Sequence, residues 1–199
     1  MADIPSDKRV SDMTLGKEHI EYENYCRQLI GLTILSVEYS EVKYSETNPT
    51  PWYKTQFADL DSVDNSIAFR TSDNKRFEIF WDGKFFQYGI GVKLDEPQDF
   101  SAFQKWDVTN NELWKKYIGT KIIDVKLTWE KVTTTEQKTG NTEHFLYPQD
   151  IKIVFSNDKS IFISAAGFLN EGDSEVYGML DNLTVTDNEE LARQVKMIL

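Results

Sequence analysis

The chain has 199 residues, of which 33 are acidic and 22 basic, giving a formal net charge of −11. Such a surface repels phosphate backbones, so we expect no direct binding to nucleic acid. Hydrophobic residues make up 40% of the sequence and aromatic residues 13%, which argues against a disordered chain and favours strands, whose pleated surface accommodates aromatic side chains.

The first predicted element is a helix that ends at Gly31. Apolar residues recur there at the spacing of one helical stripe, at Tyr22, Tyr25, Cys26, Leu29 and Ile30. Glycine then supplies the left-handed turn that ends a helix at low cost. Beyond it the period changes to two, and Leu35, Val37 and Tyr39 share the inward face of a predicted strand. Cys26 is the single cysteine, so it can form no internal disulfide, and we expect it to be a small core residue.

The segment after this strand carries the first candidate partner-binding residues. Trp52 and Tyr53 lie in "TNPTPWYKTQF", and Asp59, Asp61 and Asp64 follow in a D-x-D-x-x-D run. The run lacks the glycine and the terminal glutamate of an EF-hand calcium loop, so we expect no metal site. Core aromatics and solvated loop acids are one interpretation. The functional interpretation is an interface with aromatic anchors and an acidic rim.

Much of the second half repeats the first in order and spacing. Residues 113–127 resemble residues 25–39, with a glycine at the same place. The period again changes after that glycine, and the predicted inward face of the next strand holds Ile123, Val125 and Leu127. Two predicted hairpins also correspond, with polar turns at 72–74 and 156–158.

A second helix is predicted before Gly119, because Thr109 and Glu112 have the spacing of a capping box. The stretch 96–112, which joins the two halves, is predicted to be partly helical and packed, since it has no linker composition. We therefore predict an α+β fold, built as a tandem pseudo-repeat of a helix followed by antiparallel strands, with the two halves packed together.

The predicted boundaries are an N-terminal tail over residues 1–16, a first α+β repeat over 17–106 and a second over 107–199. One pseudo-symmetric domain is the alternative. The sequence holds no secretory signal and no run of about 18 apolar residues, so we expect a cytoplasmic protein that does not enter membranes.

A search for catalytic motifs returns none. The chain has no G-x-S-x-G elbow, no P-loop, no G-x-G-x-x-G and no H-E-x-x-H. The two histidines, His19 and His144, lack metal-ligand spacing, and we interpret both as surface residues. We expect no enzyme, no catalytic residues, no cofactor and no metal. An enzyme with an unrecognised carboxylate site stays an alternative, because a fold can bring carboxylates together irrespective of spacing.

The strongest charge feature lies near the C-terminus. Seven acids and no Lys or Arg occur between Asn170 and Ala192. Three of them have a local reason, because acids favour the first turn of a helix predicted in "NEELARQVKMIL". The other four, which we predict to steer a basic partner, are Glu171, Asp173, Glu175 and Asp181.

The pattern "LIGxxIxxV", followed by an "F…DK…I.I" hairpin in a small acidic chain, resembles that of bacterial polymorphic-toxin immunity proteins. The resemblance implies a protein that binds a cognate toxin domain, expected to be basic, and neutralises it. It carries over no individual functional residues, because immunity interfaces differ between families. The alternative from another class is a small-molecule binding module with its ligand in a cleft between the two repeats.

Overall fold

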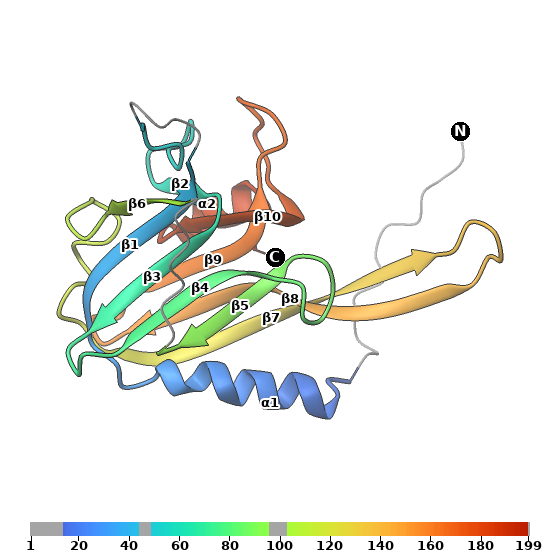
Figure 1. Cartoon of the computed structure of the whole chain (residues 1–199), viewed down its shortest axis with the longest axis horizontal. Helices are drawn as coiled ribbons and strands as arrows, with labels where there is room; N and C mark the ends of the chain where they lie inside the picture. The colour runs from blue at the N-terminus through green and yellow to red at the C-terminus, as the bar shows by residue number, and fades with distance from the viewer. Residues whose placement is uncertain (1–13, 44–48, 96–102, 199) are drawn as a thin grey trace.

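The computed structural model describes residues 14–43, 49–95 and 103–198 (Figure 1). Within these ranges the chain is mostly antiparallel sheet with little helix, which agrees with a mixed α+β class. The helical elements are α1 (Lys17–Cys26), the 3-10 turn η1 (Arg27–Leu29) and α2 (Glu189–Gln194). None of the helices in these ranges is long and apolar enough to cross a membrane.

Two five-stranded sheets make up the body. The first sheet has the spatial order β5 (Gly89–Leu94), β4 (Arg76–Asp82), β3 (Ser66–Thr71), β1 (Ile34–Val42) and β6 (Phe103–Asp107). The second sheet has the order β2 (Leu60–Val63), β10 (Tyr177–Thr186), β9 (Ser160–Gly167), β8 (Thr142–Phe155) and β7 (Ile122–Thr135). β2 thus crosses from the N-terminal half of the chain into the second sheet, where it pairs with β10.

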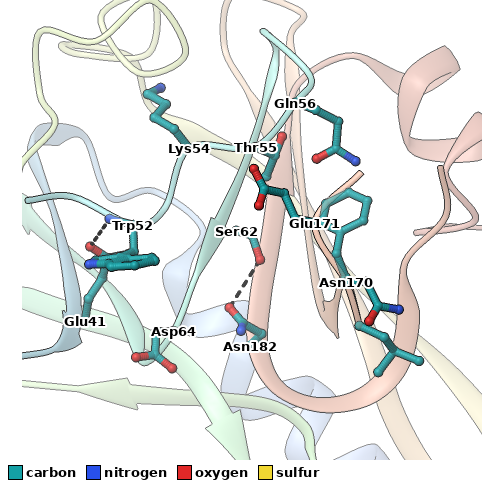
Figure 2. A pocket seen from close by; sticks show the side chains of 12 residues that line it. Glu41, Trp52, Lys54, Thr55, Gln56, Ser62, Asp64, Asn170, Glu171 and Asn182 are labelled. Atoms are coloured by element: carbon teal, nitrogen blue, oxygen red, sulfur yellow. Dashed lines mark hydrogen bonds between the residues drawn. The ribbon is translucent and has the colours of Figure 1, made fainter. Parts of the chain in front are cut away.

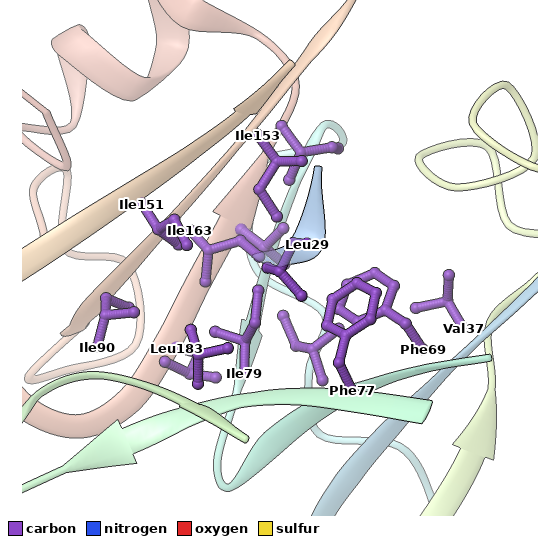
Figure 3. Packing of buried hydrophobic residues seen from close by; sticks show 14 of the residues in the cluster. Leu29, Val37, Phe69, Phe77, Ile79, Ile90, Ile151, Ile153, Ile163 and Leu183 are labelled. Atoms are coloured by element: carbon purple, nitrogen blue, oxygen red, sulfur yellow. The ribbon is translucent and has the colours of Figure 1, made fainter. Parts of the chain in front are cut away.

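The main hydrophobic core is shared by both sheets (Figure 3). Phe69 and Phe77 of the first sheet and Ile151, Ile163 and Leu183 of the second belong to one buried cluster. Burying each such side chain fully contributes about 1.5–3 kcal/mol. A second cluster on the other face of the second sheet packs α2 and the residues after it against β9.

The left-handed conformation predicted for the two glycines is confirmed. Gly31 has φ of 96° and Gly119 has φ of 78°. The residues that follow join the two sheets through reciprocal hydrogen bonds. The Gly31 amide donates to Ile122 O (2.9 Å), and the Gly119 amide donates to Ile34 O (2.8 Å). Thr33 and Lys121 form an antiparallel bridge between these bonds. We call this segment pair the junction.

In each of the two strands predicted after Gly31 and Gly119, one residue assigned to the inward face is exposed instead. Leu35 is 49% exposed and Ile123 is 47% exposed, whereas the preceding residues Ile34 and Ile122 are buried. A register irregularity follows each of these two isoleucines. It shifts the alternation by one residue, because side chains alternate between the faces of a regular strand.

The predicted second helix is also wrong, since residues 109–118 form consecutive turns. The Thr109 hydroxyl accepts from Val37 N (3.0 Å) and donates to Val37 O (3.3 Å), so it binds β1 and does not cap a helix. Trp114 N donates to Asn111 O, and Tyr117 N to Trp114 O. In these turns both of these amides bond to the carbonyl three residues earlier, and the side chains of Trp114 and Tyr117 are still buried in the core.

The stretch predicted to be partly helical at 96–112 contains a strand instead. Phe103–Asp107 forms β6 and pairs with β1, for example Tyr39 with Trp106. The outer edge of β1 would otherwise lack a hydrogen-bonding neighbour, and pairing satisfies its backbone groups. Residues 96–102 of this prediction, and residues 1–13 of the predicted N-terminal tail, lie outside the described ranges.

Candidate functional site

The segment from Pro49 to Asp59 leads into β2 and holds two adjacent aromatic side chains on opposite sides. Trp52 is 65% exposed, whereas Tyr53 is buried with its ring against Tyr39 at a centroid distance of 4.9 Å. The segment is fixed to β2 by the hydrogen bond from Ser62 N to Tyr53 O (2.7 Å). Because adjacent residues of an extended chain point in opposite directions, anchoring Tyr53 inside directs Trp52 outward.

Trp52 lines a cavity of about 740 Å³, which we call the tryptophan cleft (Figure 2). Its walls come from both halves of the chain: β1, the 52–56 segment and β2 on one side, and β10 with the 168–171 loop on the other. The lining residues are Glu41, Trp52, Lys54, Thr55, Gln56, Ser62, Asp64, Phe168, Leu169, Asn170, Glu171 and Asn182.

Three direct contacts hold the two walls of the tryptophan cleft together. Phe57 stacks on Phe168 with ring centroids 6.0 Å apart. The Gln56 side-chain amide donates to the backbone carbonyl of Asp173. The Ser62 hydroxyl donates to Asn182 Oδ1 (3.2 Å), as the dashed line in Figure 2 shows. The cleft is therefore built by tertiary contacts between segments more than 100 residues apart in sequence.

Glu41 is the chemically unusual residue of the tryptophan cleft. Its side chain is 1% exposed, and Oε2 accepts a hydrogen bond from Trp52 N (3.1 Å). Oε1 and the indole N–H of Trp106 make no hydrogen bond of regular geometry among the described residues, but this indole lies close enough to the carboxylate to lower the pKa of Glu41. Burial raises the pKa of Glu41 to about 7, while the donors of Trp52 and Trp106 lower it and Asp64 and Asp61 raise it further. An unsatisfied buried carboxylate is costly, and such groups are enriched at functional sites.

The cleft has an acidic lining. Asp64 and Glu171, both predicted to bind a partner, lie in it with Glu41. Asp64 Oδ2 also accepts from Val42 N (3.1 Å), which fixes its carboxylate at the end of β1. Lys54 lines the cleft as well, but its Nζ lies 2.8 Å from Asp61 Oδ1. The cleft is therefore lined by more acidic than basic side chains.

Tyr53, Asp59 and Asp61, also predicted to bind a partner, line a neighbouring cavity of about 630 Å³. Asp61 is buried, where it pairs with Lys54 and accepts from the Tyr39 hydroxyl (3.0 Å). Burial and the nearby Asp61 hold the pKa of Tyr39 well above its usual value. Asp61 thus acts inside the fold, as the acceptor for a buried hydroxyl.

The predicted C-terminal acids do not form one patch. Glu171 lines the tryptophan cleft, and Asp173 Oδ2 accepts from Asn170 N (2.9 Å) to shape the loop. Glu175 pairs with Lys196 at 2.6 Å. Asp181 is exposed, at the register irregularity of β10. Lys196 lies just beyond the all-acidic stretch, so a count of charges along the sequence misses its pairing.

Candidate metal ligands are dispersed. The described residues contain no group of three or more His, Cys, Asp or Glu side chains placed to hold a metal ion. Cys26 is buried, which raises the pKa of its thiol to about 12. Its prediction as a core residue is confirmed. The surface interpretation holds for His144, but is wrong for His19, which is half-buried with its ring centroid 4.7 Å from that of Trp129.

Comparisons with protein-family models, with curated proteins and with solved structures found no match to this chain. The geometry of the tryptophan cleft is therefore the main guide to function. Sequence reasoning missed Glu41 and Asn182. For Glu41 a signal was available, because it continues the inward alternation of Val37 and Tyr39. An acid at an inward position of a strand needs a partner or a function.

Proposed function

We propose that this protein is a cytoplasmic immunity protein, which binds a basic toxin domain and neutralises it through the tryptophan cleft. One observation carries the proposal: the cleft combines a buried, incompletely hydrogen-bonded Glu41 with the exposed indole of Trp52. Exposed aromatic side chains surrounded by polar groups are typical anchors of protein interfaces. The resemblance to toxin immunity proteins supports this class of partner.

The charge of the chain supports the same partner. With a net charge of −11, the whole molecule attracts a basic protein at long range, and Asp64 and Glu171 extend this field into the cleft. Electrostatic attraction of this kind raises association rates and weakens as salt screens it. Affinity would then depend on contacts inside the cleft, and the association rate on the overall charge.

The test starts with capture of proteins from a lysate of the source organism on the immobilised chain, and identification of what binds. Glu171→Lys changes the charge at the cleft, and Glu143→Lys makes the same change on β8, away from it. We expect a basic protein that associates more slowly with Glu171→Lys than with Glu143→Lys. We also expect its association rate to fall between about 50 and 300 mM salt. Equal rates for the two variants, or an acidic captured protein, would contradict the proposal.

A second candidate is a small-molecule binding module. It is favoured by the position of the cleft between segments of the two halves, and by its polar amide and hydroxyl groups, such as Asn182 and Ser62. Ligand sites commonly combine apolar walls with a few polar groups. Native mass spectrometry distinguishes the candidates. A constant added mass that denaturation releases, and that Glu171→Lys removes, would favour the small molecule.

We also infer that the chain is a tandem pseudo-repeat. The pairing of Val37 with Phe69 in β1 and β3 has its counterpart in Val125 with Ile153 in β7 and β8. The β3–β4 and β8–β9 hairpins share a register and have a positive φ at Asn74 and Asp158, at the same place in each turn. These features support repetition of four strands. The helix of the first half has no helical counterpart at 109–118.

A further inference from the structure

The hairpin of β7 and β8 projects past the two sheets. Figure 1 shows its outer part, residues 129–147, which we call the arm, extending away from the body as a two-stranded ribbon. β8 pairs with β9 only from Asp150 to Val154, so among the described residues the two strands of the arm pair only with each other. A two-stranded hairpin alone is at best marginally stable in water. The arm would therefore be stabilised by a further strand.

The outer edge of β7 is open along the arm. Glu136 N donates to Asn141 O (2.8 Å), so these residues form a hydrogen-bonded pair at the end of the ladder. Hydrogen-bonded and non-hydrogen-bonded pairs alternate along antiparallel strands, and hence Lys131, Thr133 and Thr135 direct their amides and carbonyls away from β8. All three residues are exposed, and no backbone hydrogen bond joins them to another described segment. We call this row of unpaired backbone groups the β7 edge.

The opposite edge of the arm, on β8, is less open. Leu146 directs its backbone groups outward there, but its side chain is buried. Phe86, from the connection between β4 and β5, stacks on the neighbouring Phe145 with ring centroids 5.0 Å apart. The β7 edge, by contrast, belongs to the sequence Val-Thr-Thr-Thr at 132–135, whose β-branched residues favour strands. A further strand is therefore expected on the β7 edge.

The charge of the arm favours a particular occupant. Its outer part, residues 131–142, holds two lysines and one glutamate, a net charge of +1, whereas the whole chain carries −11. Two copies that meet at their arms therefore approach through segments of low charge and keep their acidic bodies apart. A basic protein is not attracted to this segment, because Lys131 and Lys138 repel it. The β7 edge thus suits a second copy of this chain better than the basic partner proposed for the tryptophan cleft.

We propose that two copies of the chain associate through their arms, with the β7 edge pairing antiparallel to the same edge of the second copy about a two-fold axis at Thr133. Such an isologous contact places Lys131 of each copy opposite Thr135 of the other, and Thr133 opposite its own counterpart. Opposed threonines stabilise a sheet. The ends of this pairing bring Glu130 of each copy opposite Glu136 of the other, which opposes association at low salt. The joined arms form a four-stranded ribbon, and the inference does not depend on the proposed function.

Sedimentation equilibrium of the full chain at increasing concentration tests the inference. We expect a reversible equilibrium between monomer and dimer that strengthens between about 50 and 300 mM salt, because salt screens the repulsion between the two acidic chains. The complex with a basic partner should instead weaken over the same range, so the two associations are distinguishable. A chain that stays monomeric up to about 1 mM, or a dimer that salt weakens, would overturn the inference.

Two proline variants distinguish the edges of the arm. Thr133→Pro and His144→Pro each remove one outward amide and the same cross-strand contact, from Thr133 Oγ1 to His144 Nδ1 (2.9 Å), but they lie on opposite edges. Thr133→Pro should weaken the dimer at least about tenfold, since each copy loses a donor at the axis. His144→Pro should leave the dimer unchanged. Equal weakening by the two variants would contradict pairing through the β7 edge.

Thr133→Lys keeps the amide and therefore guards against an arm that proline has unfolded. It places two lysines opposite each other across the two-fold axis and should weaken the dimer, whereas His144→Lys adds the same residue on the other edge and should not. An unchanged dimer in Thr133→Lys would contradict the proposed axis. A monomeric wild type whose capture of another protein is lost in Thr133→Pro would assign the β7 edge to that protein and overturn the inference.

Discussion

The N-terminal strands β1, β3, β4 and β5 and the C-terminal strands β7, β8, β9 and β10 follow the same spatial order but carry different side chains. The pairing of Tyr39 with Ile67 corresponds to that of Leu127 with Ile151. The Tyr39 hydroxyl donates to Asp61 and accepts from the Trp114 indole (2.6 Å), whereas Leu127 has no polar group to satisfy. The same backbone pairing thus supports an apolar interior in one sheet and a polar network in the other.

The connections differ more than the strands. The tryptophan cleft is lined by the 52–56 segment before β2 and by the 168–171 loop after β9, neither of which belongs to the shared pairing. In the second sheet, β7 and β8 extend beyond the body as a long two-stranded hairpin (Figure 1). The strands with matching order thus form a scaffold, and the candidate site is made by the connecting segments, which differ between the two halves.

The largest expected effect contrasts two corresponding core positions, Cys26 and Trp114. Trp114 is buried, with its ring against those of Tyr39, Phe69 and Tyr117. Trp114→Ala should lower the free energy of unfolding by about 3–5 kcal/mol, because it leaves a large cavity. Cys26→Ala should cost about 1 kcal/mol. Urea denaturation measures both. Similar costs at the two positions would show that they are equivalent in packing, contrary to the expected contrast.

The next effect concerns a buried acid in each sheet. Burial raises the pKa of Glu41 and of Asp150 to about 7. For both acids the pKa in the folded state exceeds that in the unfolded state, so the folded state keeps its proton up to a higher pH. The free energy of unfolding should therefore fall as pH rises from about 4 to about 8. This loss amounts to about 3 kcal/mol for Glu41 and about 4 kcal/mol for Asp150.

Glu41→Gln and Asp150→Asn should each flatten part of the pH profile. Unfolding free energies in urea at pH 5 and pH 8 measure this change, with Glu143→Gln as an exposed control. If only one variant flattens the profile, the two sheets differ in how they bury charge. If neither variant does, the titration of these acids is not coupled to folding.

The smallest expected effect tests whether the two glycine turns of the junction are equivalent. Gly31 and Gly119 both have positive φ, and an added Cβ would meet no atom within 4 Å at either position. Gly31→Ala and Gly119→Ala should therefore each cost about 1–2 kcal/mol through backbone strain alone. Thermal or urea unfolding of both variants compares the costs. A difference well above 1 kcal/mol between the two costs would mean that the two turns are not equivalent in their contribution to stability.

The sequence allowed the shared strands to be predicted, because alternation and turn residues are local signals. The hairpin turns at Asn74 and Asp158 and the left-handed glycines are of this kind. The irregularities after Ile34 and Ile122 were not predictable, since the one-residue shift depends on pairing with β3 and β8. The helix predicted from Thr109 failed because its hydroxyl binds β1 instead.

The candidate site was predictable only in part. Trp52, Asp64 and Glu171 were predicted to bind a partner, and the fold brings them into one cleft. The sequence could not show that Asp61 pairs with the nearby Lys54, or that Glu175 pairs with Lys196 beyond the acidic stretch, because both contacts depend on the fold. Glu41 was missed although it continues the inward alternation of Val37 and Tyr39, whereas its hydrogen bond from Trp52 N depends on the fold.

The junction has a consequence for how the halves recognise each other. Gly31 donates to Ile122 as Gly119 donates to Ile34, so each half presents the same short edge to the other. This is the geometry of an isologous contact, the kind that relates identical subunits about a two-fold axis. Here one covalent chain replaces subunit association, and a high effective concentration holds the two edges together at any protein concentration.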